Sequence, residues 1–406
     1  MTIAIVDAYG AGRLLPAALT LRHAAYVHVR SQAPDTRLAY RPEDFTVDLQ
    51  HTGDLPALVG ALRGLGVDSV VAAAESGVLL ADELSHALGV PGNVTARSTA
   101  RRDKHLMQEA VRAAGLAAID GCCTASLEAI TEWAAGRDRW PVVVKPVLSA
   151  GTDNVFICRS IAEVTTAHEA IMTSADRYGR RNHVALAQEF LDGAEHYVNS
   201  VSRDGAHRVI EVWRYHKRLV DGHSVYDYED LLSLEDQGVP ELVGYVRDVL
   251  DALGVRNGAG HTEVMLTASG PTLIECGARL GGGQMPELMT RCVGTDQVDS
   301  LAYSLADPES FLAEAEAPYQ LKSHLRCVNL ISPGAGSVPD ESGWQPVREL
   351  ASFAGLVVNH PAGSPLSRTI DMATCPGTVY LAADDPQLLR RDYETLRGFE
   401  TAGLYG

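Results

Sequence analysis

Long apolar runs are missing from this chain. A helix that spans a membrane needs about 20 consecutive apolar residues, and the sequence has no run of even about 18. The first ten residues, MTIAIVDAYG, lack the basic start of a secretory signal and lead straight into a strand pattern. We therefore expect a cytoplasmic protein with no membrane partner.

Basic residues are scarce. Lys and Arg number 34 against 52 Asp and Glu, and the net charge is −18. A protein of this charge repels the phosphates of DNA and RNA, so we expect no nucleic-acid partner. An anionic ligand must therefore meet a local cluster of lysines and arginines.

Cysteines are few, and their pattern does not indicate a disulfide framework. There are seven, an odd number, of which two are adjacent, and no Cys-x-x-Cys pair occurs. Reduced and mostly buried thiols in a cytoplasmic protein are the simplest interpretation.

Two familiar nucleotide-binding motifs are incomplete or absent. No Gly-Lys-Ser/Thr sequence occurs, which excludes a Walker loop. Gly10 and Gly12 follow the first strand pattern, but Leu15 stands where a dinucleotide fingerprint needs its third glycine. A tight turn is therefore favoured over an NAD site.

The first 92 residues alternate between strand and helix patterns. Strands are predicted at 3–8, 23–30 and 67–75, and amphipathic helices at 54–66 and 77–89. Strands separated by helices predict a parallel α/β sheet.

Changes of pattern divide the chain into four expected domains, within the range that its length allows. We expect an α/β domain over 1–92, two mixed segments over 93–187 and 188–310, and an α+β domain over 311–406. The fold class is therefore a multidomain combination of α/β and α+β.

Two local patterns lie between these motifs. Ser98 or Thr99 is expected to cap a helix that Gly115 ends. The polar and aromatic segment 221–238 has the composition of a mobile loop. Three of its residues are expected to be ordinary loop residues rather than groups that orient a substrate: Tyr226, Asp227 and Tyr228.

The most unusual stretch is a predicted hairpin, TEVMLTASGPTLIECGAR, over 262–279. If its turn is centred on Ser269, Glu263 stands opposite Glu275 with Cβ atoms about 4.5–5.5 Å apart, where like charges destabilise. Alternation places Arg279 on the same strip as Glu275, and a slip of one residue would reverse the faces. Apolar neighbours favour a Mg²⁺ site beside an anion site over a hairpin with solvated charges.

Three features suit a polyphosphate. Lys145 follows three valines at the end of a buried strand, where a lysine either extends to solvent or meets an anion. The loop 149–154, SAGTDN, can direct backbone N–H groups at phosphate oxygens. Lys104 lies on the preceding helix.

Further on, the stretch 188–195 could hold a flat base, although on its own it has the pattern of an ordinary connection between strands.

The order of these motifs resembles the ATP-grasp superfamily of carboxylate–amine ligases, in particular the L-amino acid (dipeptide) ligase branch. The resemblance covers roughly residues 1–310 in four stretches: DKHLMQEAVRAAG, VVVKPVLSAGTDNV, AQEFLDGAEHYV and HTEVML…LIECGARLGGG. It implies a Rossmann-like pre-ATP-grasp domain over 1–92, two ATP-grasp subdomains over 93–187 and 188–310, and a C-terminal appendage over 311–406.

The resemblance also implies where ATP and its metal bind. The phosphates are expected to contact Lys104 and Lys145 beneath a loop that contains Gly151 and Thr152. The adenine and ribose are expected to contact Glu189, Phe190, Leu191 and Glu195. Mg²⁺, which Mn²⁺ can replace, is expected on Glu263 and Glu275.

For the substrate, the resemblance implies catalytic roles for Arg279 and Lys145. The substrate-binding residues expected with them are Arg279, Gly281, Gly282, His216 and Lys217. The implied reaction converts a small-molecule carboxylate, of an amino acid or a similar acid, to an acyl phosphate. A small-molecule amine then displaces phosphate to give an amide.

One departure from the family pattern concerns the metal. The usual Glu-x-Asn-x-Arg appears here as Glu275-Cys-Gly-Ala-Arg279, so Gly277 replaces a metal-binding asparagine. Similar dipeptide ligases also lack that asparagine, which favours their branch and leaves the number of metal ions open.

Two alternatives remain at this point. A biotin-carboxylase-like or other bicarbonate-phosphorylating subunit usually keeps the asparagine, which counts mildly against it. A non-catalytic nucleotide-binding module is disfavoured by the intact set of Lys, Glu and Arg. A homodimer is compatible with the resemblance.

Overall fold

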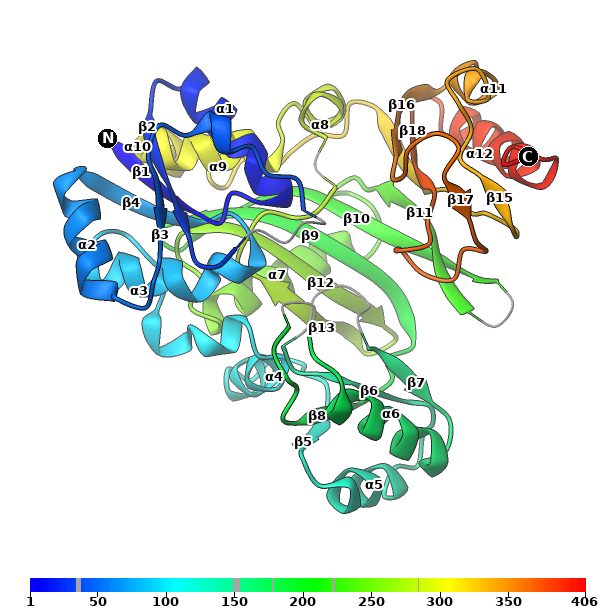
Figure 1. The fold of residues 1–406 in the computed structure, drawn as a ribbon, viewed down its shortest axis with the longest axis horizontal. Helices are drawn as coiled ribbons and strands as arrows, with labels where there is room; N and C mark the ends of the chain where they lie inside the picture. Colours follow the sequence, from blue (N-terminus) through cyan, green and yellow to red (C-terminus); the bar gives the residue numbers. More distant parts are fainter. Residues whose placement is uncertain (34–37, 149–153, 177–178, 221–222, 284) are drawn as a thin grey trace.

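The computed structural model describes residues 1–33, 38–148, 154–176, 179–220, 223–283 and 285–406. Figure 1 shows a parallel sheet at the N-terminal side, a long antiparallel sheet through the centre, and a small antiparallel sheet below it. The C-terminal segments lie at the end of the central sheet opposite the N-terminal domain.

The N-terminal sheet is parallel, as the alternating pattern predicted. Its strand order is β3-β2-β1-β4. The strands are β1 (Thr2–Val6), β2 (Ala25–Arg30), β3 (Asp48–Gln50) and β4 (Val67–Ala72), with helices α1 (Leu15–Leu21), α2 (Leu55–Gly64) and α3 (Val78–Leu88). A Cβ on Gly12 would lie 2.7 Å from that of Ala73, so the glycine permits close packing of a tight turn against β4.

The small antiparallel sheet has the order β5-β8-β6-β7 and packs against two helices. Its elements are β5 (Gly121–Thr124), α5 (Leu127–Ala135), β6 (Val142–Pro146), β7 (Phe156–Cys158), α6 (Ile161–Thr173) and β8 (Ala185–Glu189). The helix before it, α4 (Lys104–Ala113), begins later than predicted. Asp103 is its cap and accepts N–H bonds from His105 and Leu106, because Ser98 and Thr99 belong to short 3₁₀ turns.

The central sheet has eight strands in the order β13-β12-β9-β10-β11-β14-β18-β16. They are β9 (Gly193–Arg203), β10 (Ala206–Val220), β11 (His223–Leu231), β12 (Gly258–Thr267), β13 (Gly270–Gly277), β14 (His324–Asn329), β16 (Phe353–Val358) and β18 (Gly377–Ala383). Helix α7 (Val239–Ala252) packs on β10, β12 and β13. The sheet is continuous from the expected 188–310 segment into the expected 311–406 segment.

The expectation of a mobile loop over 221–238 was wrong for half of its length. Residues 223–231 form β11, which pairs with β10 on one side and β14 on the other. In the sequence this segment looks polar. Two acidic residues, Asp227 and Glu229, follow Val225 on one face, and Tyr226 and Tyr228 lie on the other. It nevertheless forms a strand because both of its edges find partners.

The remaining elements complete the two ends of the molecule. They are α8 (Pro286–Val293), α9 (Gln297–Ala306), α10 (Pro308–Ala313), β15 (Gly336–Ser337), α11 (Gln345–Arg348), β17 (Pro365–Leu366) and α12 (Pro386–Thr401). Within the described residues, no helix is both long and apolar enough to cross a membrane.

A buried arginine joins the N-terminal domain to the central sheet. Arg101 is inaccessible to solvent and donates to the Asp82 carboxylate at 2.5 Å and to the Leu253 carbonyl at 2.7 Å. These contacts tie the segment between α3 and α4, which contains Arg101, to α3 and to the end of α7.

Replacing Arg101 with Ala should lower the free energy of unfolding by about 3–5 kcal/mol, because the buried Asp82 carboxylate loses its cation. Urea denaturation monitored by circular dichroism measures the change. Arg391→Ala removes an exposed pair with Asp385 and should change stability by less than about 1 kcal/mol. Equal effects of the two substitutions would contradict the structural role of Arg101.

Candidate active site

The hairpin β12–β13 brings two glutamates together through a bulge. Thr267 pairs with Gly270, so the turn consists of two residues. The prediction that the turn is centred on Ser269 was therefore wrong. With that turn alone, Glu263 would face Ile274. A register shift between Glu263 and Val264 inserts one residue and places Glu263 opposite Glu275. The predicted pairing is therefore confirmed, but the bulge rather than the turn produces it.

A lysine and a histidine close to these carboxylates offset the repulsion between them. Lys104 Nζ lies 3.0 Å from Glu275 Oε1, and His261 Nε2 lies 3.5 Å from Glu263 Oε1. Burial alone would raise the pKa of Glu263, but the hydrogen bond and charge of His261, together with the charges of Lys217 and Arg279, lower the pKa overall. Glu263 therefore favours its charged form.

The two glutamates line a cavity of about 190 Å³ between the hairpin and the small antiparallel sheet. Lysines and carboxylates gather at part of its wall, and apolar side chains such as Val143, Ile157 and Met265 line the rest. Of the predicted residues, the cavity brings together Lys104, Lys145, Glu189, Phe190, Leu191, Glu195, Lys217, Glu263 and Glu275. Gly151 and Thr152 lie outside the described residues.

Lys145 is the more strongly perturbed cation of this cavity. Its side chain is 7% exposed, and burial together with the charge of Lys104 lowers its pKa to about 8. The carboxylates of Glu275, Glu263 and Glu195 oppose this shift only in part. A buried ammonium held next to another cation gains an anionic partner when phosphate enters.

Adjacent residues on β10 point in different directions. Lys217 reaches into the cavity, where its Nζ lies 2.6 Å from Glu195 Oε2 and over the Tyr226 ring. His216 stacks on Tyr228 and lies 3.4 Å from Asp230 Oδ2. It is not among the described residues that line either of the cavities at this site.

Arg279 is held by a residue of the N-terminal domain. Glu75, which follows β4, lies 2.8 Å from Arg279 Nε and also pairs with Arg102. Burial would raise the pKa of Glu75, but the two arginines lower it to about 2. The sequence motifs do not include Glu75, since nothing in its local sequence pairs it with a residue 204 positions away.

The same ion pair explains the glycine in the family motif. A Cβ on Gly277 would lie 2.9 Å from Glu75 Oε2 and 3.1 Å from Arg279 Cζ. Any side chain at this position must displace one of the two groups. The absence of the usual asparagine side chain at position 277 therefore leaves the space that the Glu75–Arg279 pair occupies.

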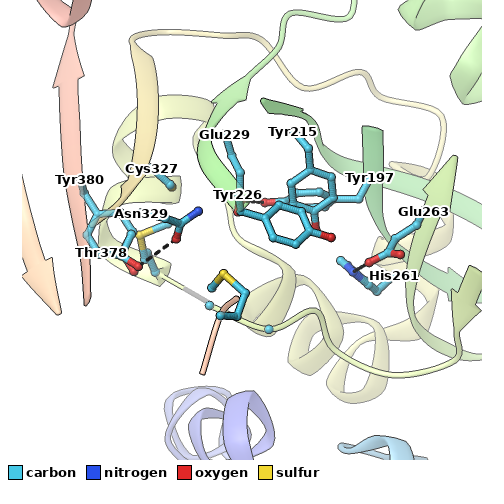
Figure 2. Close-up of a pocket in the computed structure, with 14 residues that line it drawn as sticks. Tyr197, Tyr215, Tyr226, Glu229, His261, Glu263, Cys327, Asn329, Thr378 and Tyr380 are labelled. Carbon is cyan, nitrogen blue, oxygen red and sulfur yellow. Dashed lines mark hydrogen bonds and ion pairs between the residues drawn. The ribbon is translucent and has the colours of Figure 1, made fainter. Parts of the chain in front are cut away.

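A second cavity of about 390 Å³ adjoins the first and shares Tyr226 and Glu263 with it. Figure 2 shows tyrosines from β9, β10 and β11 on one side and residues of the C-terminal strands on the other. Its labelled wall consists of Tyr197, Tyr215, Tyr226, Glu229, His261, Glu263, Cys327, Asn329, Thr378 and Tyr380.

The glycines after Arg279 reach this second cavity in part. Gly282 and Gly283 line it. Gly281 packs against the sheet instead: its N–H donates to Gln297 Oε1 at 2.8 Å, and a Cβ there would lie 2.8 Å from Asn199 Oδ1. Sequence reasoning missed most of the second wall. Its residues alternate along predicted strands, but alternation does not reveal which strands are neighbours.

Comparisons with known proteins agree with this fold. Residues 138–287 match the ATP-grasp domain family. The fold is similar to the crystal structure of L-amino acid ligase from Bacillus licheniformis, with a TM-score of 0.75 and 17% identity over 98% of this chain and 97% of that one. These findings define the class of protein as one with the ATP-grasp fold.

Sequence relatives narrow the class further. The chain is 34% identical over 416 residues to dapdiamide A synthase of Enterobacter agglomerans, covering 98% of this chain and 95% of the relative. It is 24% identical over 229 residues to L-arginine-specific L-amino acid ligase of Bacillus subtilis, covering 55% and 54% of the two chains. The chain therefore belongs to the ATP-grasp family of ligases, and it is an ATP-dependent enzyme that forms amide bonds between carboxylates and amines.

Replacing Gly277 with Ala should leave the fold intact but reduce acid-dependent ADP release between about tenfold and a hundredfold, since it displaces Arg279 from its place beside Glu75. A coupled assay of ADP formation and a thermal unfolding curve test both parts. Gly64→Ala, where an added Cβ meets nothing within 4 Å, is the matched control. Unchanged turnover in Gly277→Ala would contradict the proposed importance of the pair.

The lowered pKa of Lys145 predicts how nucleotide affinity depends on pH. Above about pH 8 the free protein loses this positive charge, so its dissociation constant for ADP should rise, by about tenfold over the next one to two pH units. Lys145→Met should bind ADP more weakly and show a flatter profile. Calorimetric titrations across this range measure both proteins, and parallel profiles would exclude Lys145 as the titrating group.

Proposed function

We propose that this ligase activates the carboxylate of an amino acid or amino-acid-like acid and joins it to an amine such as a second amino acid. The observation that carries the proposal is the facing pair of Glu263 and Glu275 beside Lys104 and Lys145 in one cavity. The names of the two sequence relatives, a dapdiamide synthase and an L-amino acid ligase, support the choice of substrates.

The donor set suits Mg²⁺ as the metal of the reaction. Glu263 and Glu275 offer hard carboxylate oxygens, and Mg²⁺ in phosphate-transferring sites commonly binds one or two carboxylates together with phosphate oxygens and water. Among the described residues no larger cluster of ligating side chains exists, which fits a metal that shares its ligands with the nucleotide. When bound, the ion neutralises phosphate charge, and Mn²⁺ is expected to replace it.

The surrounding residues are assigned to ATP by their place in the first cavity. Lys104 and Lys145 are to hold the phosphates. Gly151 and Thr152, which lie outside the described residues, are assigned to the phosphates by the family resemblance alone. Glu189, Phe190 and Leu191 are to contact the adenine, and Glu195 the ribose. Because Lys104 is paired with Glu275 in the free protein, nucleotide binding must exchange a protein carboxylate for phosphate around this cation. Lys217, which is paired with Glu195 in the free protein, is to contribute to substrate binding.

The reaction then balances in two steps. A carboxylate oxygen of the acid forms a bond to the γ-phosphorus of ATP as the bond to ADP breaks. The amine nitrogen next forms a bond to the acyl carbon, phosphate leaves, and the nitrogen gives up a proton. Arg279 is to hold the carboxylate and then the acyl phosphate, next to Gly281 and Gly282, while the cations stabilise charge on the transferring phosphoryl group.

Other expectations remain proposals of the same kind. The four domain segments, 1–92, 93–187, 188–310 and 311–406, follow the family resemblance, as do a cytoplasmic location and a homodimer. A contribution of His216 to substrate binding would require it to leave Asp230 and Tyr228. The carboxylase alternative is weakened by Gly277 and by the sequence relatives.

Glu263→Gln and Glu275→Gln should each reduce acid-dependent ADP release by about a hundredfold or more, since each removes a charge that the metal requires. Raising the Mg²⁺ or Mn²⁺ concentration should recover part of the activity, which a mere folding defect would not allow. Glu341→Gln, on an 88% exposed side chain, is the matched control. Full activity of either active-site variant would contradict the metal assignment.

A further inference from the structure

Two neighbouring rows of side chains cross one face of the central sheet at the hairpin β12–β13. The first row contains the facing glutamates, Glu263 and Glu275. Side chains two residues apart on a strand share a face, so the positions two residues along form a second row on the same side of the sheet. In order across β13, β12, β9 and β10, the second row consists of Gly277, His261, Asn199 and Glu211.

A chain of polar contacts runs along the second row and ends at the first. Asn199 Nδ2 donates to Glu211 Oε1 at 2.5 Å, and Asn199 Oδ1 lies 2.7 Å from His261 Nδ1. His261 Nε2 lies 3.5 Å from Glu263 Oε1, a contact that Figure 2 shows. The chain therefore leads from a buried carboxylate to one of the two carboxylates proposed to bind the metal.

Glu211 fixes the direction of this chain. Its two oxygens accept N–H bonds from Asn199 and from the Trp213 indole, the latter at 3.0 Å. A carboxylate only accepts, so the Asn199 amide turns its NH₂ group to Glu211 and its oxygen to His261. An amide oxygen also only accepts, so His261 carries a proton on Nδ1 and is held by that bond, with its other nitrogen facing Glu263.

Stability alone gives no reason for a glutamate in this position. Asn199 and Glu211 are each 2% exposed. Replacing a buried polar network by apolar side chains of similar volume is often neutral or stabilising. The orientation of a metal ligand does give a reason, because hydrogen-bonded partners behind a ligand hold it in its binding conformation.

Gly281 leaves the space that the chain occupies. A Cβ there would lie 2.8 Å from Asn199 Oδ1 and 3.1 Å from His261 Nδ1, the two atoms that the bond joins. Gly277 makes room in a similar way for the ion pair of Arg279. Two glycines of one segment thus each admit a polar pair that holds a residue of the proposed site.

We propose that Glu211 and Asn199 are positioning residues of the ligase: through His261 they hold the Glu263 carboxylate in the conformation that binds the metal. Gly281 belongs to the same arrangement, because a side chain there would displace the chain. This inference rests on the ligase function and the metal site proposed above.

The affinity for Mn²⁺ tests the chain without turnover. Electron paramagnetic resonance measures free Mn²⁺ while the metal is added to enzyme in excess over ADP, and calorimetry measures the affinity for ADP in EDTA. Glu211→Gln is isosteric, but its amide can donate to Asn199, which is then no longer fixed with its oxygen towards His261. The Kd for Mn²⁺ should rise by about tenfold to a hundredfold, whereas the Kd for ADP without metal should stay the same.

A second variant separates positioning from the charge of Glu211. Gly281→Ala leaves that charge in place and displaces Asn199 or His261 instead, so the Kd for Mn²⁺ should again rise by about tenfold or more. Because both changes act on one chain, the double variant should lose little more affinity than the weaker-binding single variant.

Two matched controls identify a mere folding effect. In Gly64→Ala the added Cβ meets nothing within 4 Å, and Glu400→Gln changes another carboxyl, 4% exposed, in the C-terminal segment. Both should keep the wild-type affinity for Mn²⁺, even where a thermal unfolding curve shows that Glu400→Gln is less stable.

The outcomes separate this inference from the proposed function. Wild-type Mn²⁺ affinity in either Glu211→Gln or Gly281→Ala would overturn the positioning chain and leave the ligase and its facing glutamates intact. An equal loss of affinity for ADP without metal would also overturn it, since that result indicates a general disturbance of the cavity. If the wild-type enzyme with ADP binds no Mn²⁺, the proposed metal site fails and the chain fails with it.

Discussion

Two carboxylates of like charge face each other across the hairpin β12–β13, and most of the active site is arranged around them. The bulge next to Glu263 brings Glu275 opposite, which a regular hairpin with the same two-residue turn would not do. In the free protein Lys104 and His261 lie against the pair. Two carboxylates held this close favour a divalent cation between them, and this supports the metal site proposed above.

The N-terminal domain contributes directly to this chemistry. Glu75 reaches from the end of β4 to Arg279 and Arg102, and its carboxylate occupies space next to the α-carbon of Gly277. An asparagine at 277 and a glutamate at 75 would compete for the same volume. The glycine therefore signifies more than a missing metal ligand, because it allows an ion pair between domains to orient the arginine proposed to hold the acid.

The C-terminal segment takes part through the continuous eight-stranded sheet. Strands β14 and β18 extend the sheet beyond β11, so that Cys327, Asn329 and Tyr380 join the tyrosines of β9 to β11 around one cavity. The cavity proposed for the nucleotide and this second cavity share Tyr226 and Glu263. The part of the chain that the family resemblance implied to be an appendage thus forms one wall of the space beside the proposed metal ligands.

Local patterns in the sequence were sufficient for the parallel N-terminal domain and for most helices. They predicted the facing glutamates only through a turn centre that the structure does not have, since the bulge beside Glu263 produces the pairing. Periodicity and motif order carry this information because neighbours in sequence generate it. Tertiary structure alone decided that 223–231 is a strand, that Glu75 holds Arg279, and that Glu229 and Asn329 share a wall. Each of these depends on partners tens to hundreds of residues away, and a strand's alternation specifies its two faces but not the strands that will lie beside it.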